Sequence, residues 1–160
     1  MAADPDPLPR DGAEAAFAVA TQTAASGATR AAARGPGRVG VIDIGSNTVR
    51  LVVYDVPTRL PLPVFNEKAA CELGLGLASS GRLNPKGVPR ALQALQRYAL
   101  LAKVMEVDQL RVVATAAVRE AEDGPAFVAA VEEVCALPVH VLSGAEEARL
   151  AAVGLLNSVP

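Results

Sequence analysis

Two strand-like runs of large apolar residues, separated by four small or polar ones, place the strongest limit on how this chain can fold. Residues 39–56 read VGVIDIGSNTVRLVVYDV, and the break between the runs is Gly-Ser-Asn-Thr at residues 45–48. Runs of this kind favour strands, and a short polar break between them predicts a hairpin with a tight turn. A third extended run at residues 64–73 follows a proline-containing loop, so we expect three strands before the first helix.

Beyond the third strand, helix-like and strand-like segments alternate. Prolines near helix starts and apolar residues at helical spacing indicate the helices. The expected segments are a loop at 73–81, a helix with Asn84 as N-cap and Pro85 in its first turn that runs to about Met105, a buried strand at 111–118 that runs into a loop, a helix that begins at Asp123, a short strand at 138–142, and a helix from Ser143 to about Leu156. This order predicts an α/β fold: a mixed five-stranded sheet with helices on its faces, whose later strands are parallel and joined by right-handed crossovers.

Residues 1–37 differ in composition from the rest of the chain. They contain 13 Ala, 4 Pro and 4 Gly but few large apolar side chains. Such a segment cannot bury enough apolar surface to offset the entropy of ordering it. We therefore expect a disordered Ala/Pro/Gly-rich arm at 1–37, with at most a transient helix over 13–25, and one folded unit at 38–160.

Composition also limits the interior and the partners. Hydrophobic residues make up 51% of the chain but aromatic residues only 3%, so the core must be packed from Ala, Val and Leu. A net charge of -2 without a basic cluster argues against nucleic-acid and membrane partners. Because the sequence has no spanning segment and no secretory signal, we expect a cytoplasmic protein. Cys71 and Cys135 are too few for a disulfide scaffold or a zinc site and are expected to be buried thiols.

The turn between the first two strands is the first candidate site. Consecutive backbone N–H groups at Gly45, Ser46, Asn47 and Thr48 would form a donor site for an anion, and small residues let a phosphate approach closely. Asp43, just before the turn, is placed to hold a divalent cation against the same phosphate. The sequence fits neither a Walker loop nor a dinucleotide fingerprint. The alternative is an ordinary hairpin, since Gly, Ser and Asn are favoured in such turns, preceded by an aspartate that ends strand pairing.

The start of the last helix is the second candidate. Ser143 and Glu146 have the spacing of a capping box, which gives Glu146 a structural role. Glu147 is not needed for the cap and lies at the carboxyl end of a strand, the edge at which open α/β sheets place their ligands. A carboxylate there could be the general base that deprotonates a water for attack on phosphorus. The alternative is that Glu147 only complements the helix dipole.

Arg119 is the third candidate, because an arginine at the carboxyl edge of a sheet can clamp a phosphoryl oxygen. It can equally pair with Glu120 or Glu122 at the surface. His140 has no second histidine and no nucleophile at a recognisable spacing, and is interpreted as structural. Gly74 and Gly76 fit a mobile loop better than a phosphate cradle.

Five sequence blocks occur together in a fixed order: VIDIGSNTVRLVV, NEK at 66–68, LGLGL, VVATAAVREAED and VLSGAEEARL. With them, the sequence resembles the exopolyphosphatase and guanosine pentaphosphate phosphatase (Ppx/GppA) family across residues 38–160. That family belongs to the actin-like ATPase superfamily of actin and sugar kinases, in which two ribonuclease-H-like lobes clamp phosphates and a divalent cation in the cleft between them. The resemblance implies that this chain forms the first, N-terminal lobe.

The resemblance also implies roles for the candidate residues. Asp43 to Thr48 are similar to the first phosphate-binding hairpin, with Asp43 helping to position Mg²⁺ or another divalent cation. Arg119 resembles the phosphate-contacting arginine, and Glu147 the residue that activates the attacking water. The implied reaction is hydrolysis of the terminal phosphoanhydride bonds of inorganic polyphosphate with release of phosphate. Guanosine pentaphosphate stays open as the substrate, because nothing in the sequence of this lobe identifies a guanine pocket.

One departure from the family pattern limits these expectations. The family has a second phosphate hairpin of the form Asp-Ile/Leu-Gly-Gly-Gly-Ser, and no such string occurs in these 160 residues. We expect the first lobe of a longer enzyme, with the second lobe absent and with weak or no activity by itself. A non-catalytic phosphate-binding module and a homodimer of the full-length form stay open. So does an interaction surface on the exposed face of the 85–105 helix.

Overall fold

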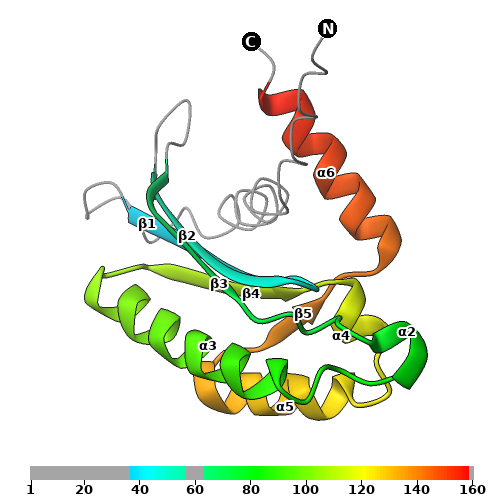
Figure 1. Ribbon diagram of the computed structural model, residues 1–160. Coiled ribbons are helices and arrows are strands. Elements are labelled where there is room, and N and C mark those ends of the chain that lie inside the picture. The colour runs from blue at the N-terminus through cyan, green and yellow to red at the C-terminus, as the bar shows by residue number, and fades with distance from the viewer. Residues whose placement is uncertain (1–36, 57–62, 159–160) are drawn as a thin grey trace, which may run out of the picture.

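The computed structural model describes residues 37–56 and 63–158, with side chains up to Val153. These residues form one five-stranded sheet with helices on both faces (Figure 1). In chain order the elements are β1 (Gly37–Ile44), β2 (Thr48–Val56), β3 (Pro63–Ala70), α2 (Leu77–Ser80), α3 (Gly87–Val104), β4 (Gln109–Ala114), α4 (Ala116–Glu120), α5 (Gly124–Cys135), β5 (Val139–Val141) and α6 (Gly144–Ser158). The expected order of strands and long helices is confirmed. Two short helices were not expected: α2 lies in the expected 73–81 loop, and α4 overlaps the end of the strand expected at 111–118.

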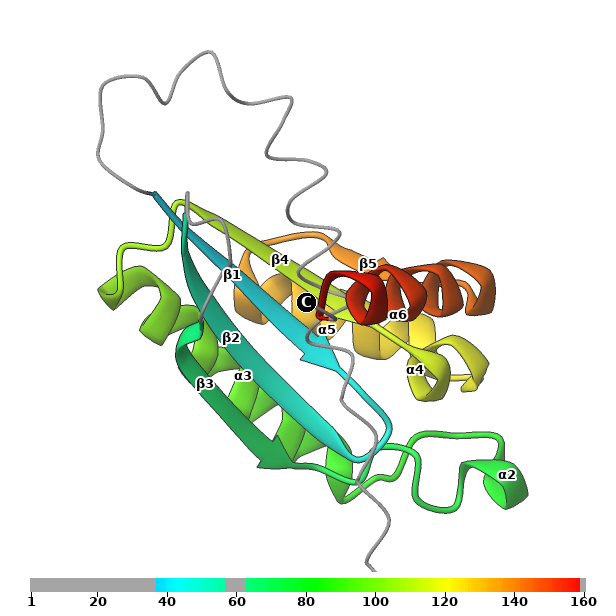
Figure 2. The same cartoon turned by 90° about the horizontal axis from the view of Figure 1, so that it is seen from above.

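The strand order across the sheet is β3-β2-β1-β4-β5 (Figure 2). β1 and β2 form the predicted hairpin, and β3 pairs antiparallel with β2. β4 is parallel to β1, and β5 is parallel to β4. The mixed sheet with parallel later strands is therefore confirmed, and the carboxyl ends of β1, β4 and β5 meet at one edge.

The arm expected at residues 1–37 lies outside the described residues, except for its last position. Gly37 is the first residue of β1, where it pairs with Val56. The next backbone amide, at Arg38, donates to Asp108 Oδ2 at 2.8 Å. β1 therefore begins at Gly37, one residue before the expected start of the folded unit.

The two faces of the sheet are covered differently. α3 and α5 pack on one face, where Ile42 and Ile44 of β1 belong to the larger core cluster (Figure 1). The other face carries α6, and there Val41 clusters with Leu142 and Leu150. Since side chains alternate along a strand, Asp43 lies on the same face as Val41. Most buried core side chains are Ala, Val or Leu, as the composition predicted.

The two cysteines are buried and free, as expected. Burial raises the pKa of both the Cys71 and the Cys135 thiols. Both thiols are therefore held protonated, which suits packing rather than nucleophilic chemistry. In the described part of the chain, no helix is long and apolar enough to cross a bilayer.

The segment after β3 differs from the expected strand at 64–73. The strand ends at Ala70, because the amides of Cys71 and Glu72 both donate to Asn47 O at 2.9 Å and Glu72 has a φ of 56°. α3 then begins at Gly87 and not at Asn84. Asn84 instead links the start of this region to the segment after β3. It is buried, and its Nδ2 donates to Glu72 O at 3.0 Å.

The prediction of a strand at 111–118 is also wrong for its second half. β4 ends at Ala114, and the next residues form α4. The amides of Val118 and Arg119 donate to Thr115 O at 3.1 Å, which closes this short helix. Alanine, arginine and glutamate favour helix over strand, so local propensity prevails once β4 leaves the sheet. Arg119 is consequently presented by a helix at the carboxyl edge and not by a loop.

Candidate active site

The β1–β2 turn is held from behind by the segment that follows β3. Gly45 N donates to Thr48 O at 3.0 Å within the turn. Ser46 O accepts a hydrogen bond from Gly74 N at 2.8 Å, and the Asn47 carbonyl accepts the two amides described above. Within residues 37–56 and 63–158, the Ser46 and Asn47 amides donate to no protein acceptor. The Ser46, Asn47 and Thr48 carbonyls are therefore bonded, while the part of the chain that the structure describes leaves two consecutive N–H groups available for an anion.

Small residues bring the backbone segments close together here. A Cβ at Gly45 would lie 3.3 Å from Thr48 O, and one at Gly74 would lie 3.1 Å from Ser46 Cβ. Gly74 is thus packed against the turn, which corrects its interpretation as part of a mobile loop. Gly76 and Gly81, with φ of 79° and 69°, flank α2.

A hollow of about 580 Å³ opens beside this turn. Ser46 and Asn47 form one wall, and the loop around α2 and the start of α4 form the others. Glu72 and Glu120 also line it. Figure 2 shows α2, α4 and the turn at the same end of the sheet.

Backbone hydrogen bonds join the turn to the neighbouring strand ends. Thr115 N donates to Ile44 O at 3.1 Å, and Leu142 N donates to Ala114 O at 2.9 Å. The turn, the start of α4 and the start of α6 are therefore fixed at one sheet edge. This is the edge at which open α/β sheets bind their ligands.

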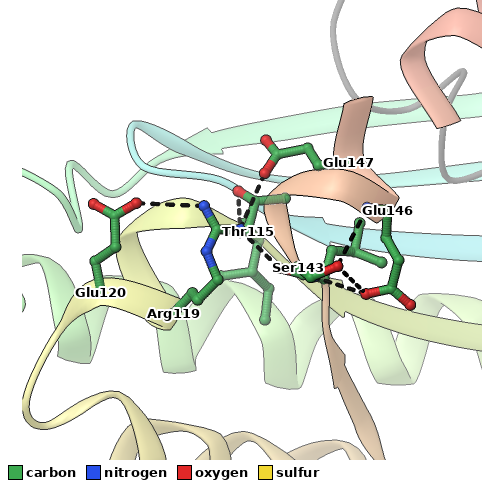
Figure 3. Close-up of polar contacts among 8 residues, drawn as sticks. Thr115, Arg119, Glu120, Ser143, Glu146 and Glu147 are labelled. Atoms are coloured by element: carbon green, nitrogen blue, oxygen red, sulfur yellow. Dashed lines mark hydrogen bonds and ion pairs between the residues drawn. The ribbon is translucent and has the colours of Figure 1, made fainter. Parts of the chain in front are cut away.

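Arg119 and Glu147, predicted independently as functional residues, are in contact at this edge (Figure 3). Arg119 Nη1 donates to Glu147 Oε2 at 3.2 Å and to Leu142 O at 2.7 Å. Its Nη2 donates to Glu120 Oε1 at 3.3 Å, so the expected surface pairing with Glu120 occurs as well. Glu122 does not make the other expected pair; its amide donates to Gly81 O instead.

The predicted capping box is present at the start of α6. Glu146 Oε2 accepts hydrogen bonds from Ser143 Oγ at 2.7 Å and Ser143 N at 2.8 Å, and Glu146 N donates to Ser143 Oγ at 3.2 Å. These bonds from Ser143, with a smaller contribution from His140, lower the pKa of Glu146 to about 2. His140 Nε2 lies 3.3 Å from Glu146 Oε1. Both residues are structural, as predicted, and together they fix the first helical turn beside Glu147.

The lowered pKa predicts a pH-dependent contribution of Glu146 to stability. A carboxylate whose pKa is lower in the folded state stabilises the fold above its unfolded pKa, and this is lost as pH falls through the folded value. Glu146→Gln should therefore lower the melting temperature near pH 7, and the difference from the unsubstituted protein should close between pH 4.5 and about 2. Thermal unfolding followed by circular dichroism measures this. Glu133→Gln, a substitution at an exposed α5 position, is the control, and a Glu146→Gln difference independent of pH would contradict the assignment.

Asp43, the predicted metal ligand, lies near the end of β1 just before the turn. It stands opposite Arg50 of β2 in the sheet register, and Arg50 Nε donates to Asn66 Oδ1 at 2.8 Å. Among the described residues, no group of three His, Cys, Asp or Glu side chains could hold a metal ion. Mg²⁺ is commonly bound by one or two carboxylates together with substrate phosphates. The single Asp43 carboxylate beside the turn would therefore fit Mg²⁺ only as a ligand shared with substrate phosphates.

Two residues of this edge were missed by the sequence interpretation. Glu120 was considered only as a surface partner of Arg119, and Glu72 was not considered at all. Both line the hollow. Only the short α4 helix and the positive φ of Glu72 bring them there, and neither feature was predicted.

Comparison with known proteins identifies the family of this chain. The model of the Ppx/GppA phosphatase family matches residues 52–160. The chain belongs to this family. The matched region includes Arg119 and Glu147, whereas the β1–β2 turn precedes it.

Two curated relatives of this chain are named as exopolyphosphatases. Exopolyphosphatase 2 of Mycobacterium tuberculosis is 37% identical over 133 residues, which cover 76% of this chain and 42% of the relative. Exopolyphosphatase 1 of Mycobacterium bovis is 32% identical over 114 residues, covering 71% of this chain and 33% of the relative. The chain thus spans less than half the length of these relatives.

Solved Ppx/GppA structures confirm the fold. The Aquifex aeolicus family member superimposes with a TM-score of 0.72 at 28% identity, covering 78% of this chain and 41% of that one. An exopolyphosphatase from Cytophaga hutchinsonii gives a TM-score of 0.63 at 30% identity, covering 68% and 35%. The fold is therefore that of Ppx/GppA proteins, and this chain covers less than half of each of these two structures.

Proposed function

We propose that this chain is the N-terminal lobe of an exopolyphosphatase that hydrolyses terminal phosphoanhydride bonds of inorganic polyphosphate. The carrying observation is the 3.2 Å contact between Arg119 Nη1 and Glu147 Oε2 at the carboxyl edge of the sheet. It puts a carboxylate that can accept a proton beside a cation that can bind phosphate. Family membership and the exopolyphosphatase relatives support the substrate class.

In this proposal Glu147 is the general base. Its side chain is 42% exposed, so a water molecule can reach it. The water oxygen attacks the terminal phosphorus, its proton passes to the Glu147 carboxylate, and the bond from that phosphorus to the bridging oxygen breaks. The capping box fixes the helical turn that carries Glu147, which limits the positions the base can take.

Arg119 and the turn amides stabilise the charge that develops on the phosphoryl oxygens. The Arg119 guanidinium is anchored through Nη1 to Leu142 O, a backbone atom at the end of β5. Donors fixed before the reaction cost little reorganisation when charge develops. The Ser46 and Asn47 amides are fixed in the same way by the bonds to their carbonyls.

Mg²⁺ or another divalent cation is part of the proposal, with Asp43 as the ligand from this lobe. The bound ion would neutralise negative charge on the substrate phosphates. The hydroxyls of Ser46 and Thr48 are further oxygen donors in the adjoining turn.

A single lobe provides one wall of such a site. The relatives are more than twice as long as the matched segment, and the family resemblance places the opposite wall in a second lobe. Because catalysis depends on positioning the substrate from both sides, we expect little phosphate release from these 160 residues alone. If these 160 residues release no phosphate at all, they act as a non-catalytic phosphate-binding module. A cytoplasmic location and a homodimer of the longer form belong to the same proposal.

Guanosine pentaphosphate is the second candidate substrate, and the hollow beside the turn favours it. A volume of about 580 Å³ lies in the range of small-molecule sites. The Glu72 carboxylate at its wall can accept hydrogen bonds from a base.

Initial rates on long polyphosphate and on guanosine pentaphosphate decide between the substrates. They are to be measured on a protein in which this lobe is continued by the family's second lobe. We expect the higher kcat/KM on polyphosphate, and Glu72→Gln should leave that value unchanged. A higher kcat/KM on the nucleotide, lowered by Glu72→Gln, would support the second candidate. Failure to release phosphate from either substrate would contradict the proposed function.

A further inference from the structure

We propose that Glu120 occupies, in the substrate-free protein, the place on Arg119 that a substrate phosphate takes. This inference rests on the proposed function, since it concerns the same phosphate-binding arginine. It assigns to Glu120 a role in setting how tightly an anion binds.

The three acceptors of Arg119 are not equivalent. Leu142 O is a backbone atom held by its place at the β4–β5 edge, where Leu142 N donates to Ala114 O. Glu147 is carried by the capped first turn of α6. The Glu120 side chain is 61% exposed and lies on the last residue of a five-residue helix. Glu120 is therefore the acceptor that an incoming anion can displace at the lowest cost.

The Arg119–Glu120 pair is not a product of regular helix geometry. Side chains at successive helical positions do not face each other. The contact forms because Arg119 reaches across to Leu142 O through Nη1, which leaves Nη2 directed to the outer side of the guanidinium (Figure 3). The Glu120 carboxylate then binds that outer nitrogen.

Glu120 also lines the same hollow as the other anion donors of the site. Those donors are the available amides of Ser46 and Asn47. Carboxylate and phosphate oxygens accept hydrogen bonds from a guanidinium in the same way. A phosphate bound to the turn would meet Glu120 both as a competitor for Arg119 Nη2 and as a like charge.

The expected effect of removing this charge is a gain in affinity. An exposed ion pair contributes little, and its loss corresponds to about a two- to fivefold change in an equilibrium constant. Glu120→Gln keeps the size of the side chain and its amide oxygen but removes the negative charge. It should therefore bind tripolyphosphate about two- to fivefold more tightly than the unsubstituted chain. A purely structural role for Glu120 would predict no gain.

The test is a titration of the ¹⁵N-labelled 160-residue chain with tripolyphosphate, followed through the Ser46 and Asn47 amides and the Arg119 Nε–H signal. Glu122→Gln is the matched control. It also removes one negative charge, two residues after Glu120, but the Glu122 side chain does not contact Arg119. We expect tighter binding in Glu120→Gln and affinity close to that of the unsubstituted chain in Glu122→Gln.

Three results would overturn the inference. They are unchanged or weaker binding in Glu120→Gln, an equal gain in both variants, and no response of Arg119 in any chain. If the unsubstituted chain binds tripolyphosphate through the turn and Arg119 while Glu120→Gln changes nothing, only the role of Glu120 is lost. If no chain responds at the turn or at Arg119, the phosphate site of the proposed function is lost with it.

Discussion

Gly124→Ala is expected to lower the free energy of unfolding by about 3 kcal/mol, a large part of the stability of a domain of this size. Gly124 begins α5, and a Cβ on it would lie 2.0 Å from Val118 O and 3.2 Å from Val118 C. These are backbone atoms of α4, so no side-chain rotation can relieve the clash. Either α4 or α5 must move, and the displacement would reach Arg119, the residue after Val118.

Gly144 provides the matched control, because it also begins a helix, α6. A Cβ on Gly144 would meet nothing within 4 Å. Gly144→Ala should therefore change the free energy of unfolding by less than about 0.5 kcal/mol. Urea unfolding followed by circular dichroism measures both variants. Equal stabilities for the two variants would show that α4 and α5 are not packed as described.

The hairpin and the capping box could be predicted because both are local. A polar break between two β-branched runs determines the first, and the Ser143-to-Glu146 spacing determines the second. The sheet edge that carries the site also followed from the order of elements, since the carboxyl ends of parallel strands must meet. For the same reason Arg119 and Glu147 were placed at one edge before their contact was seen.

The rest of the site depends on packing between segments distant in sequence. β4 ends at Ala114, where the Leu142 amide donates to Ala114 O and the Thr115 amide donates to Ile44 O. The apolar sequence after Val113 does not indicate this end of the strand. The position of Gly74 against Ser46 likewise requires the turn at Glu72. Glu120 was missed because its contact with Arg119 departs from the spacing by which helical neighbours usually meet.

The contact between Arg119 and Glu147 carries the functional account. In the proposed mechanism, the Arg119 guanidinium beside Glu147 binds the phosphate that the attacking water approaches. A phosphate bound on the outer side of the anchored guanidinium would leave Glu147 in place to receive the proton of the water. Glu146 is the neighbouring carboxylate, but Ser143 and His140 already bind both of its oxygens. The two glutamates therefore differ in role although they are adjacent in sequence.

Phosphate release from polyphosphate by the Glu147→Gln and Glu146→Gln variants tests this account most directly, in a protein that continues this lobe with the second lobe of the family. Removing a general base typically lowers the rate 10²- to 10⁴-fold, so Glu147→Gln should lose about that much kcat while its circular dichroism spectrum stays unchanged. Glu146→Gln should keep kcat within about fivefold, because the charge it removes supports only a helix cap. A folded Glu147→Gln variant that releases phosphate at nearly the unsubstituted rate would contradict the assignment of Glu147 as the base.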